Sequence, residues 1–392
     1  MNWKEPKQIE DNKYDLPGDW LKIEYFEALN ILFRVENSLR IFVFIILKNE
    51  YKDKWKDLSV TSDDSESSTI NAIAKKRIAQ DKNYAYLGYV MTSPLLHLTS
   101  GELIRIITSD SYWKLFKDYF LGSREIIKNK LDEIGNVRNS LAHFRPVKKG
   151  DLELVKQNSI HTLSEVEKTL HDFISCPYIV PTNTEDSWYT ELTTLGTEEC
   201  IINFKQSKNE EWIKLILDFK PPILDEVKAY SGLRIRTITL KTDRVLINYP
   251  ELTSELICVT EVLPHFFAKN PNFNELKKSL KFTFSKNCLT KNYKRIKSEL
   301  EHILLQINRE LALIKEDNLA RGKLIEVITC NVTKSESEYY HLQNQPFKIE
   351  IDGDSPVEYW GQLNYSTNNF ITETENYPWM PVTISDDNSL PF

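Results

Sequence analysis

The spacing of apolar residues changes near residue 181, and this change constrains the fold more than any other feature. Over residues 20–178 the apolar residues recur at the spacing of an α-helix, and glycines are few. From 181 the polar segment "PTNTEDS" marks a linker, and alternating apolar and polar residues follow it. We therefore expect a helical domain over residues 1–180 and an α+β domain over residues 185–392.

Three stretches of the second half alternate as strands do. They are LRIRTITL at 233–240, RVLINY at 244–249 and KLIEVITCNV at 323–332. The intervening "KTD" predicts a hairpin turn between the first two. The charged residues 291–317 show helical periodicity and predict an amphipathic helix.

Cysteine usage and hydropathy exclude several classes of protein. The five cysteines are far apart and form no CxxC pair, so neither a disulfide framework nor a zinc site is indicated. The apolar run "IFVFIIL" at 41–47 is far shorter than the roughly 20 residues of a membrane span and predicts a buried helix. We see no secretory leader, expect a cytoplasmic protein, and find no pattern that calls for a metal or another cofactor.

The charge of the chain is unevenly distributed. The net charge is −7, which argues against a protein that coats nucleic acid. Residues 121–150, however, hold seven Lys and Arg against three Asp and Glu, whereas the residues after Lys348 hold eight Asp and Glu and no Lys or Arg. One segment is thus basic, and the C-terminal end is acidic.

Two predicted helices each carry a charged residue in the middle of an apolar stripe, counted at 100° per residue. The stripe around Arg138 consists of Ile127, Leu131, Ile134 and Leu141. The stripe around Glu36, with Arg40 at its border, consists of Tyr25, Leu29, Leu32, Leu39 and Val43. Because an unpaired buried charge costs several kcal/mol, we expect the two stripes to meet, with Glu36 beside Arg138 or Arg40.

The segment "NVRNSLAHFRP" at 136–146 carries the candidate catalytic residues Arg138, Asn139 and His143. Asn139 and His143 are neighbours at i and i+4, but Arg138 and His143 point about 140° apart on an ideal helix. Either the end of the helix is distorted near Pro146, or two copies of the motif meet in a symmetric dimer. The second interpretation is the one we adopt.

The hexapeptide Arg138–His143 resembles the R-(polar)-x-x-x-H signature of the HEPN superfamily, helical bundles found in many prokaryotic toxin and phage-defence ribonucleases. "VENSLRIFVFIIL" at 35–47 and "LTSGELIRIITSDSYWKLF" at 98–116 resemble the flanking segments of that family. The resemblance covers residues 20–178 and implies an α-helical HEPN bundle ahead of the α+β domain. It also implies metal-independent RNA cleavage in a homodimer, by attack of the ribose 2′-hydroxyl on the neighbouring phosphorus.

The implied chemistry suits these side chains. An imidazole titrates near neutrality and is a suitable proton acceptor and donor, and a guanidinium binds phosphate oxygens through two donors. His143 would exchange protons with the 2′-hydroxyl or the 5′-oxygen, Arg138 would hold the phosphate, and Asn139 would orient the imidazole or bind a phosphate oxygen. The RNA backbone would be guided by Arg145, Lys148 and Lys149.

The C-terminal "ISDDNSLPF" resembles the acidic tip of bacterial single-stranded-DNA-binding proteins, which docks on partner proteins. The residues that carry this resemblance are Asp386, Asp387, Leu390, Pro391 and Phe392. The alternatives are a solvated acidic tail and an anionic segment that masks the basic residues around 138–149.

These features support two classes of function. The first is a dimeric endoribonuclease regulated by its C-terminal domain, in an antiviral abortive-infection setting or as a toxin silenced by a neighbouring gene product. The second is a non-enzymatic dimeric interaction module that binds a protein or a nucleic acid, in which Arg138 only stabilises the helices.

Overall fold

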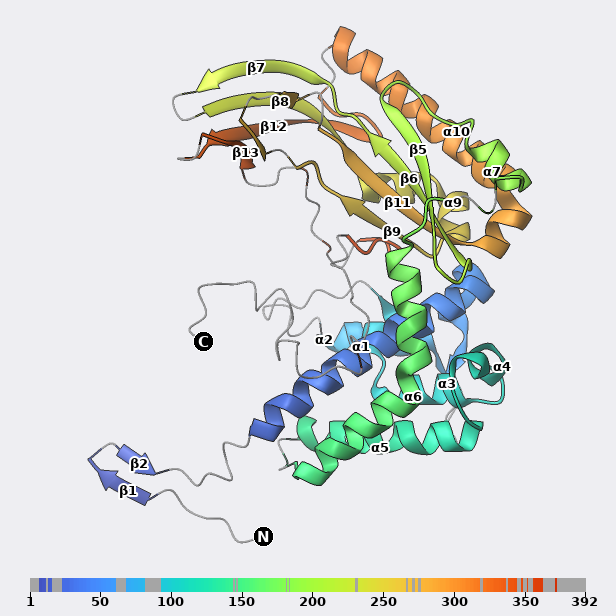
Figure 1. The fold of residues 1–392 in the computed structure, drawn as a ribbon, viewed down its shortest axis with the longest axis vertical. Helices are drawn as coiled ribbons and strands as arrows, with labels where there is room; N and C mark the ends of the chain where they lie inside the picture. Colours follow the sequence, from blue (N-terminus) through green and yellow to red (C-terminus); the bar gives the residue numbers. More distant parts are fainter. Residues whose placement is uncertain are drawn as a thin grey trace.

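The structure is a computed structural model. It describes residues 7–11, 13–15, 23–60, 68–81, 93–143, 145, 147–180, 182, 184–229, 232–265, 267–269, 272–273, 276–317, 320–335, 338–343, 347, 351, 355–361 and 371. A helical region forms one end of the molecule, and a region rich in strands forms the other (Figure 1). Among the described residues, no helix combines the length and apolar character needed to cross a membrane.

The helical region is built around the long helix α1, which contacts α3, α5 and α6. Its helices are α1 (Ile23–Tyr51), α2 (Ile70–Asp81), α3 (Ser100–Thr108), α4 (Trp113–Phe116), α5 (Arg124–Ala142) and α6 (Lys149–Ser175), with the 3-10 turns η2 (Lys52–Asp57), η4 (Pro94–His97) and η5 (Lys117–Tyr119). The run Phe42–Leu47 of α1 is buried in the core of this region, as the sequence predicts. Leu29, which the sequence places on the buried stripe of this helix, is 43% exposed instead.

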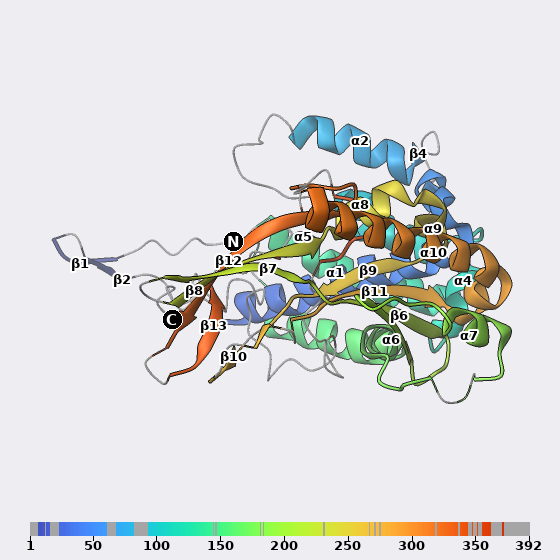
Figure 2. The ribbon, with the colours of Figure 1, turned by 90° about the horizontal axis from the view of Figure 1, so that it is seen from above.

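Two antiparallel sheets form the second region. The five-stranded sheet has the order β10 (Phe267–Ala268), β13 (Tyr340–Gln343), β12 (Ile325–Lys334), β8 (Gly232–Leu240) and β7 (Ile223–Ala229). The four-stranded sheet has the order β5 (Cys200–Gln206), β6 (Trp212–Phe219), β11 (Lys278–Ser285) and β9 (Cys258–Val262). The helices of this region are α7 (Ser187–Leu192), α8 (Thr242–Asn248), α9 (Pro250–Glu255) and α10 (Lys286–Asp317). The apolar face of α10 packs on both sheets (Figure 2).

The predicted fold class, an α-helical HEPN bundle followed by an α+β domain, is wrong. The chain is mixed: the N-terminal part adds the strand pairs β1 (Lys7–Glu10) with β2 (Lys13–Asp15) and β3 (Ser59–Val60) with β4 (Ser68–Thr69), and the C-terminal part is rich in strands. Strands of two to four residues are too short to show an alternating pattern. All eight residues of β6 are buried, so this strand does not alternate either.

The predicted strand at 244–249 is also wrong. The chain forms helix α8 there, so the predicted hairpin does not exist, whereas β8, β12 and α10 lie where the sequence places strands and a helix. Val245, Leu246 and Tyr249 are the buried residues of this stretch, a spacing of i, i+1 and i+4 that fits one face of a helix. A run of six residues is short enough to fit both periods.

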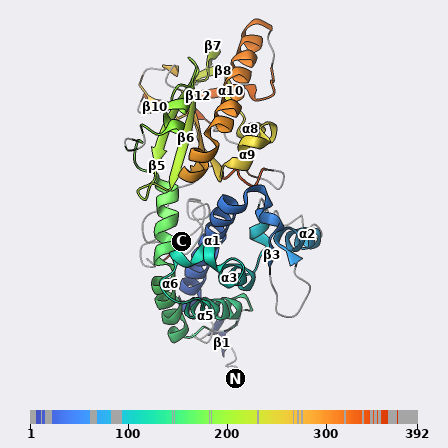
Figure 3. The same ribbon diagram turned by 90° about the vertical axis from the view of Figure 1, so that its right-hand side faces the viewer.

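The C-terminal segment returns to the helical region. The backbone of Glu358 and Trp360 pairs with Val259 of β9, while the Glu358 carboxylate lies 3.0 Å from Nζ of the fully buried Lys48 in α1. Further on, the backbone N–H of Ile371 donates to Glu167 of α6 at 2.5 Å. Figure 3 shows α6 running from the helical region up to the sheets. These contacts fasten the end of the described chain to α1 and α6.

Candidate functional site

The candidate catalytic residues lie at the C-terminal end of α5. The helix begins after Ser123, whose side chain accepts a hydrogen bond from the backbone N–H of Ile126 at 3.5 Å. The face that packs on the core consists of Ile127, Leu131, Ile134, Val137 and Leu141. His143 is the C-cap, and its backbone N–H donates to Asn139 O at 3.2 Å. The motif thus ends the helix beside solvent.

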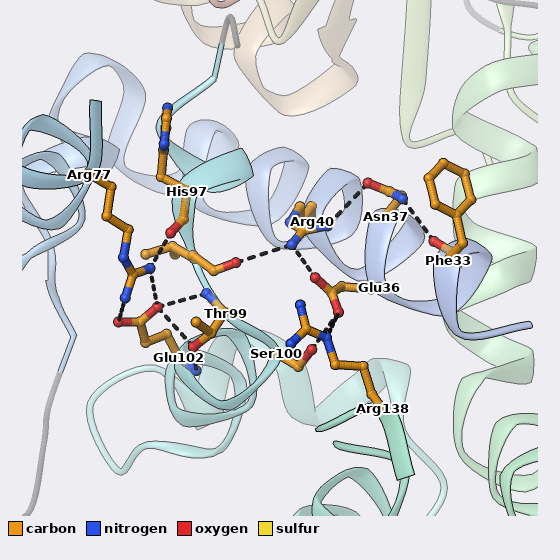
Figure 4. A network of polar contacts seen from close by, with 11 residues as sticks. Phe33, Glu36, Asn37, Arg40, Arg77, His97, Thr99, Ser100, Glu102 and Arg138 are labelled. Atoms are coloured by element: carbon orange, nitrogen blue, oxygen red, sulfur yellow. Dashed lines mark hydrogen bonds and ion pairs between the residues drawn. The ribbon is translucent and has the colours of Figure 1, made fainter. Parts of the chain in front are cut away.

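Glu36 of α1 binds two arginines, Arg40 and Arg138 (Figure 4). The positions of the charges on the apolar stripes of the two helices predict Glu36 beside one or the other. Arg138 donates from Nε to Glu36 Oε2 at 3.0 Å, and Arg40 pairs with Oε1 of the same carboxylate. Arg40 also donates to the backbone oxygen of Leu98 at 3.1 Å. The carboxylate therefore holds α1 and α5 together and fixes the guanidinium of Arg138 by its Nε edge.

Ser100 is a third donor to Glu36, and sequence reasoning missed it. Its Oγ donates to Glu36 Oε2 at 2.5 Å from the first residue of α3. The preceding residue, Thr99, forms a capping box with Glu102, which in turn makes a two-donor ion pair with Arg77 at 2.7 and 2.8 Å. The T-x-x-E spacing of residues 99–102 could have predicted part of this arrangement, because it is typical of a capping box and places Ser100 in the first turn of a helix.

The charge of Glu36 is strongly stabilised. Burial raises the pKa of this carboxyl, but the hydrogen bond from Ser100 and the guanidinium groups of Arg40 and Arg138 outweigh burial, so the pKa lies below its ordinary value of 4.5. Glu36 therefore remains a carboxylate throughout the neutral range, and Arg138 keeps its partner there.

Replacing Glu36 by Gln is expected to lower the free energy of unfolding by about 1–3 kcal/mol, because it leaves two guanidiniums without their counter-charge. The folded-state pKa is depressed, so the contribution of the carboxylate is present above about pH 4.5 and is lost as the pH falls through the folded-state pKa. Denaturant unfolding of both proteins between pH 3 and 7 checks this. Glu27→Gln, which removes a more exposed partner of Lys156, is the matched control and is expected to cost less than about 1 kcal/mol. Equal losses in the two variants would contradict the prediction.

The three motif side chains are accessible but separate. The side chain of Arg138 is 34% exposed, and Asn139 and His143 are exposed. Within the described residues no hydrogen bond or ion pair joins these three side chains, and α5 is helical through Ala142. One copy of the helix therefore presents Arg138 and His143 in different directions.

The core beside Arg138 offers no room for a substrate. A cavity of about 20 Å³ lies between α1, α3 and α5, bordered by Glu36, Ser100 and Arg138 on its polar side. That volume holds about one water molecule. Any nucleotide must approach Arg138 from the solvent side of α5, where Asn139 and His143 also lie.

The predicted RNA-guiding residues surround the start of α6. Arg145, Lys148 and Lys149 are all exposed, and Lys148 is the N-cap of α6. These cations continue the exposed end of α5. The predicted partner-binding tip, Asp386, Asp387, Leu390, Pro391 and Phe392, lies outside the described residues.

Comparison of the chain with protein-family models, with curated proteins and with solved structures found no match.

Proposed function

We propose that the chain is a metal-independent endoribonuclease of the HEPN type, with Arg138, Asn139 and His143 as its catalytic residues. The observation that supports this best is the attachment of Arg138. Among the described residues its guanidinium forms a hydrogen bond and ion pair only with Glu36, through Nε, so the two terminal nitrogens remain available to phosphate oxygens. A guanidinium held at one edge and exposed at the other is preorganised for a developing negative charge.

The proposed reaction is an intramolecular transfer. The ribose 2′-oxygen bonds to phosphorus, the bond from phosphorus to the 5′-oxygen breaks, and the products are a 2′,3′-cyclic phosphate and a 5′-hydroxyl. The imidazole of His143 accepts the proton of the 2′-hydroxyl, and the resulting imidazolium donates it to the leaving 5′-oxygen. Arg138 stabilises the charge on the equatorial phosphate oxygens.

Two protomers complete the proposed site. Because α5 presents Arg138 and His143 in different directions, a single copy does not bring both to one phosphodiester. In a two-fold dimer each chain contributes the same groups, and the arginine of one copy meets the imidazole of the other. The exposed Arg145, Lys148 and Lys149 then line the path of the RNA on both sides.

The proposed setting is the cytoplasm, where the strand-rich region regulates the nuclease in antiphage defence or as part of a toxin system. Every cysteine of the chain is free, which suits a reducing compartment. The acidic end either docks a protein partner or masks the basic residues 138–149. Deleting residues 381–392 is expected to increase basal cleavage if the end is a mask, and unchanged cleavage would remove that idea.

The decisive experiment is incubation of the purified chain with total RNA in EDTA. We expect cleavage that leaves 2′,3′-cyclic phosphate ends, read by end-specific ligation. RNA that stays intact with the full chain and with the 381–392 deletion would favour the interaction module instead. The interaction-module alternative is supported by the Glu36–Arg138 ion pair, because this pair joins α1 and α5 and gives Arg138 a structural role.

A further inference from the structure

Three lysines gather on the face of the four-stranded sheet opposite α10. Lys205 of β5 and Lys214 of β6 are direct cross-strand partners. Lys214 lies opposite Thr283 of β11, so Lys281, two residues earlier, is its diagonal neighbour on the same face. Such positions lie about 5 Å apart when opposite and about 7–8 Å apart when diagonal. The charges of Lys205 and Lys214 both act on Lys281, so the three ammonium groups lie near one another.

Placing these three lysines together creates electrostatic repulsion between their ammonium groups. Like charges in opposite cross-strand positions are destabilising. Lys214 is only 7% exposed and donates to the backbone oxygen of Ile174 at the C-terminal end of α6, so its place in the fold is explained. Among the described residues, Lys205 and Lys281 have neither a hydrogen bond nor an ion pair from their ammonium groups. Two of the three ammonium groups thus lack a partner in the part of the chain that the structure describes.

The carboxylate of Asp218, whose charge acts on Lys281, is already engaged. Asp218 accepts hydrogen bonds from Asn203 and Lys277 at 3.0 Å and from Ser279 at 2.5 Å. Burial lowers the pKa of Lys281, the charges of Lys214 and Lys205 lower it further, and Asp218 raises it only in part. An anion placed between the lysines would relieve this repulsion.

We propose that Lys205, Lys214 and Lys281 bind a phosphate group on this face of the sheet. Ammonium groups bind phosphate as point charges, and three of them match a group with several anionic oxygens. Lys205 is exposed and lies on the edge strand β5, so the site opens to solvent at this edge. The phosphate comes from a small phosphorylated molecule or from an RNA backbone. The site is distinct from the motif at the C-terminal end of α5, because that motif precedes the start of α6 whereas Lys214 binds Ile174 at its end, and a helix of 27 residues is about 40 Å long.

Thermal unfolding of the full chain at constant ionic strength tests the site. The probes are inorganic pyrophosphate and a single-stranded RNA without terminal phosphates, with sulfate as the anion control. We expect a probe at about 100 times its Kd to raise the Tm of the wild type by about 2 °C or more. A pyrophosphate effect identifies a small phosphorylated ligand, and an effect of RNA alone identifies a nucleic-acid backbone. If neither probe raises the Tm, or if sulfate raises it equally, the proposal is overturned.

Lysine substitutions make the test specific. In Lys281→Met and Lys205→Met we expect the Tm shift to fall to less than half, while the Tm without ligand equals or exceeds that of the wild type because one like charge is gone. Lys228→Met, on the exposed strand β7 of the other sheet, is expected to keep the full shift. Retention of the full shift in both Lys281→Met and Lys205→Met would overturn the proposal.

Discussion

Replacing His143 by Ala is expected to reduce RNA cleavage by about 10²–10⁴-fold, the usual contribution of a positioned general acid or base. His143 is exposed and its side chain has no hydrogen bond to a described residue, so the substitution is expected to leave the Tm within about 1 °C of the wild type. Cleavage of a labelled RNA in EDTA measures the loss. His161→Ala, an exposed histidine on α6, is the matched control and is expected to keep full activity.

Replacing Arg138 by Ala is expected to cost about 10²–10³-fold in the same assay, because the developing charge loses a fixed donor. This variant also loses the bond to Glu36, so a fall in Tm accompanies the fall in rate. Full activity in either alanine variant would refute the assignment of that residue.

Mixing the two inactive variants tests whether the site is shared between protomers. If the arginine of one copy works with the imidazole of the other, a heterodimer of Arg138→Ala and His143→Ala contains one intact pair. Random exchange of protomers is then expected to restore about a quarter of the wild-type rate. No recovery after complete exchange would place both groups in one chain and contradict the dimeric site.

The Glu36–Arg138 contact was predictable from sequence because each charge interrupts an apolar stripe. A buried charge needs a partner, so the pattern predicts that Glu36 lies beside Arg138 or Arg40 without any knowledge of the fold. The role of Ser100 was much harder to predict, since the hydroxyl reaches Glu36 across 64 positions of sequence and an isolated serine predicts no particular contact. The local spacing of residues could therefore be interpreted from the sequence, whereas contacts between distant segments could not.

The strand-rich region shows the same limit. LRIRTITL alternates clearly and forms β8, with Arg234 and Arg236 exposed and Leu233 and Ile235 buried. By contrast, the adjacent Lys277 and Lys278 look alike in the sequence, yet the side chain of Lys277 is 48% exposed and that of Lys278 is fully buried. Whether a lysine at the junction of two sheets is buried depends on how those sheets pack, and the neighbouring residues in the sequence do not predict it.

Replacing Lys278 by Met is expected to lower the free energy of unfolding of the strand-rich region by about 3–5 kcal/mol. Nζ of Lys278 lies 2.9 Å from Glu261 Oε2 and donates to the backbone oxygen of Leu240 at 2.8 Å. The pair thus joins β11 and β9 of one sheet to the end of β8 in the other. Its loss leaves the carboxylate of Glu261, 1% exposed, with the hydroxyl of Thr242 at 2.7 Å but no cation.

The double variant Lys278→Met with Glu261→Leu separates the cost of an unpaired charge from the value of the pair. Because two apolar side chains of similar size need no counter-charge, we expect the double variant to be more stable than Lys278→Met alone and to regain most of the loss. Denaturant unfolding followed by tryptophan fluorescence measures the three proteins, and Lys277→Met is the control, with an expected change below about 1 kcal/mol. A double variant as unstable as Lys278→Met would mean that the bond from Lys278 to Leu240, and not the buried carboxylate, determines the stability of this junction.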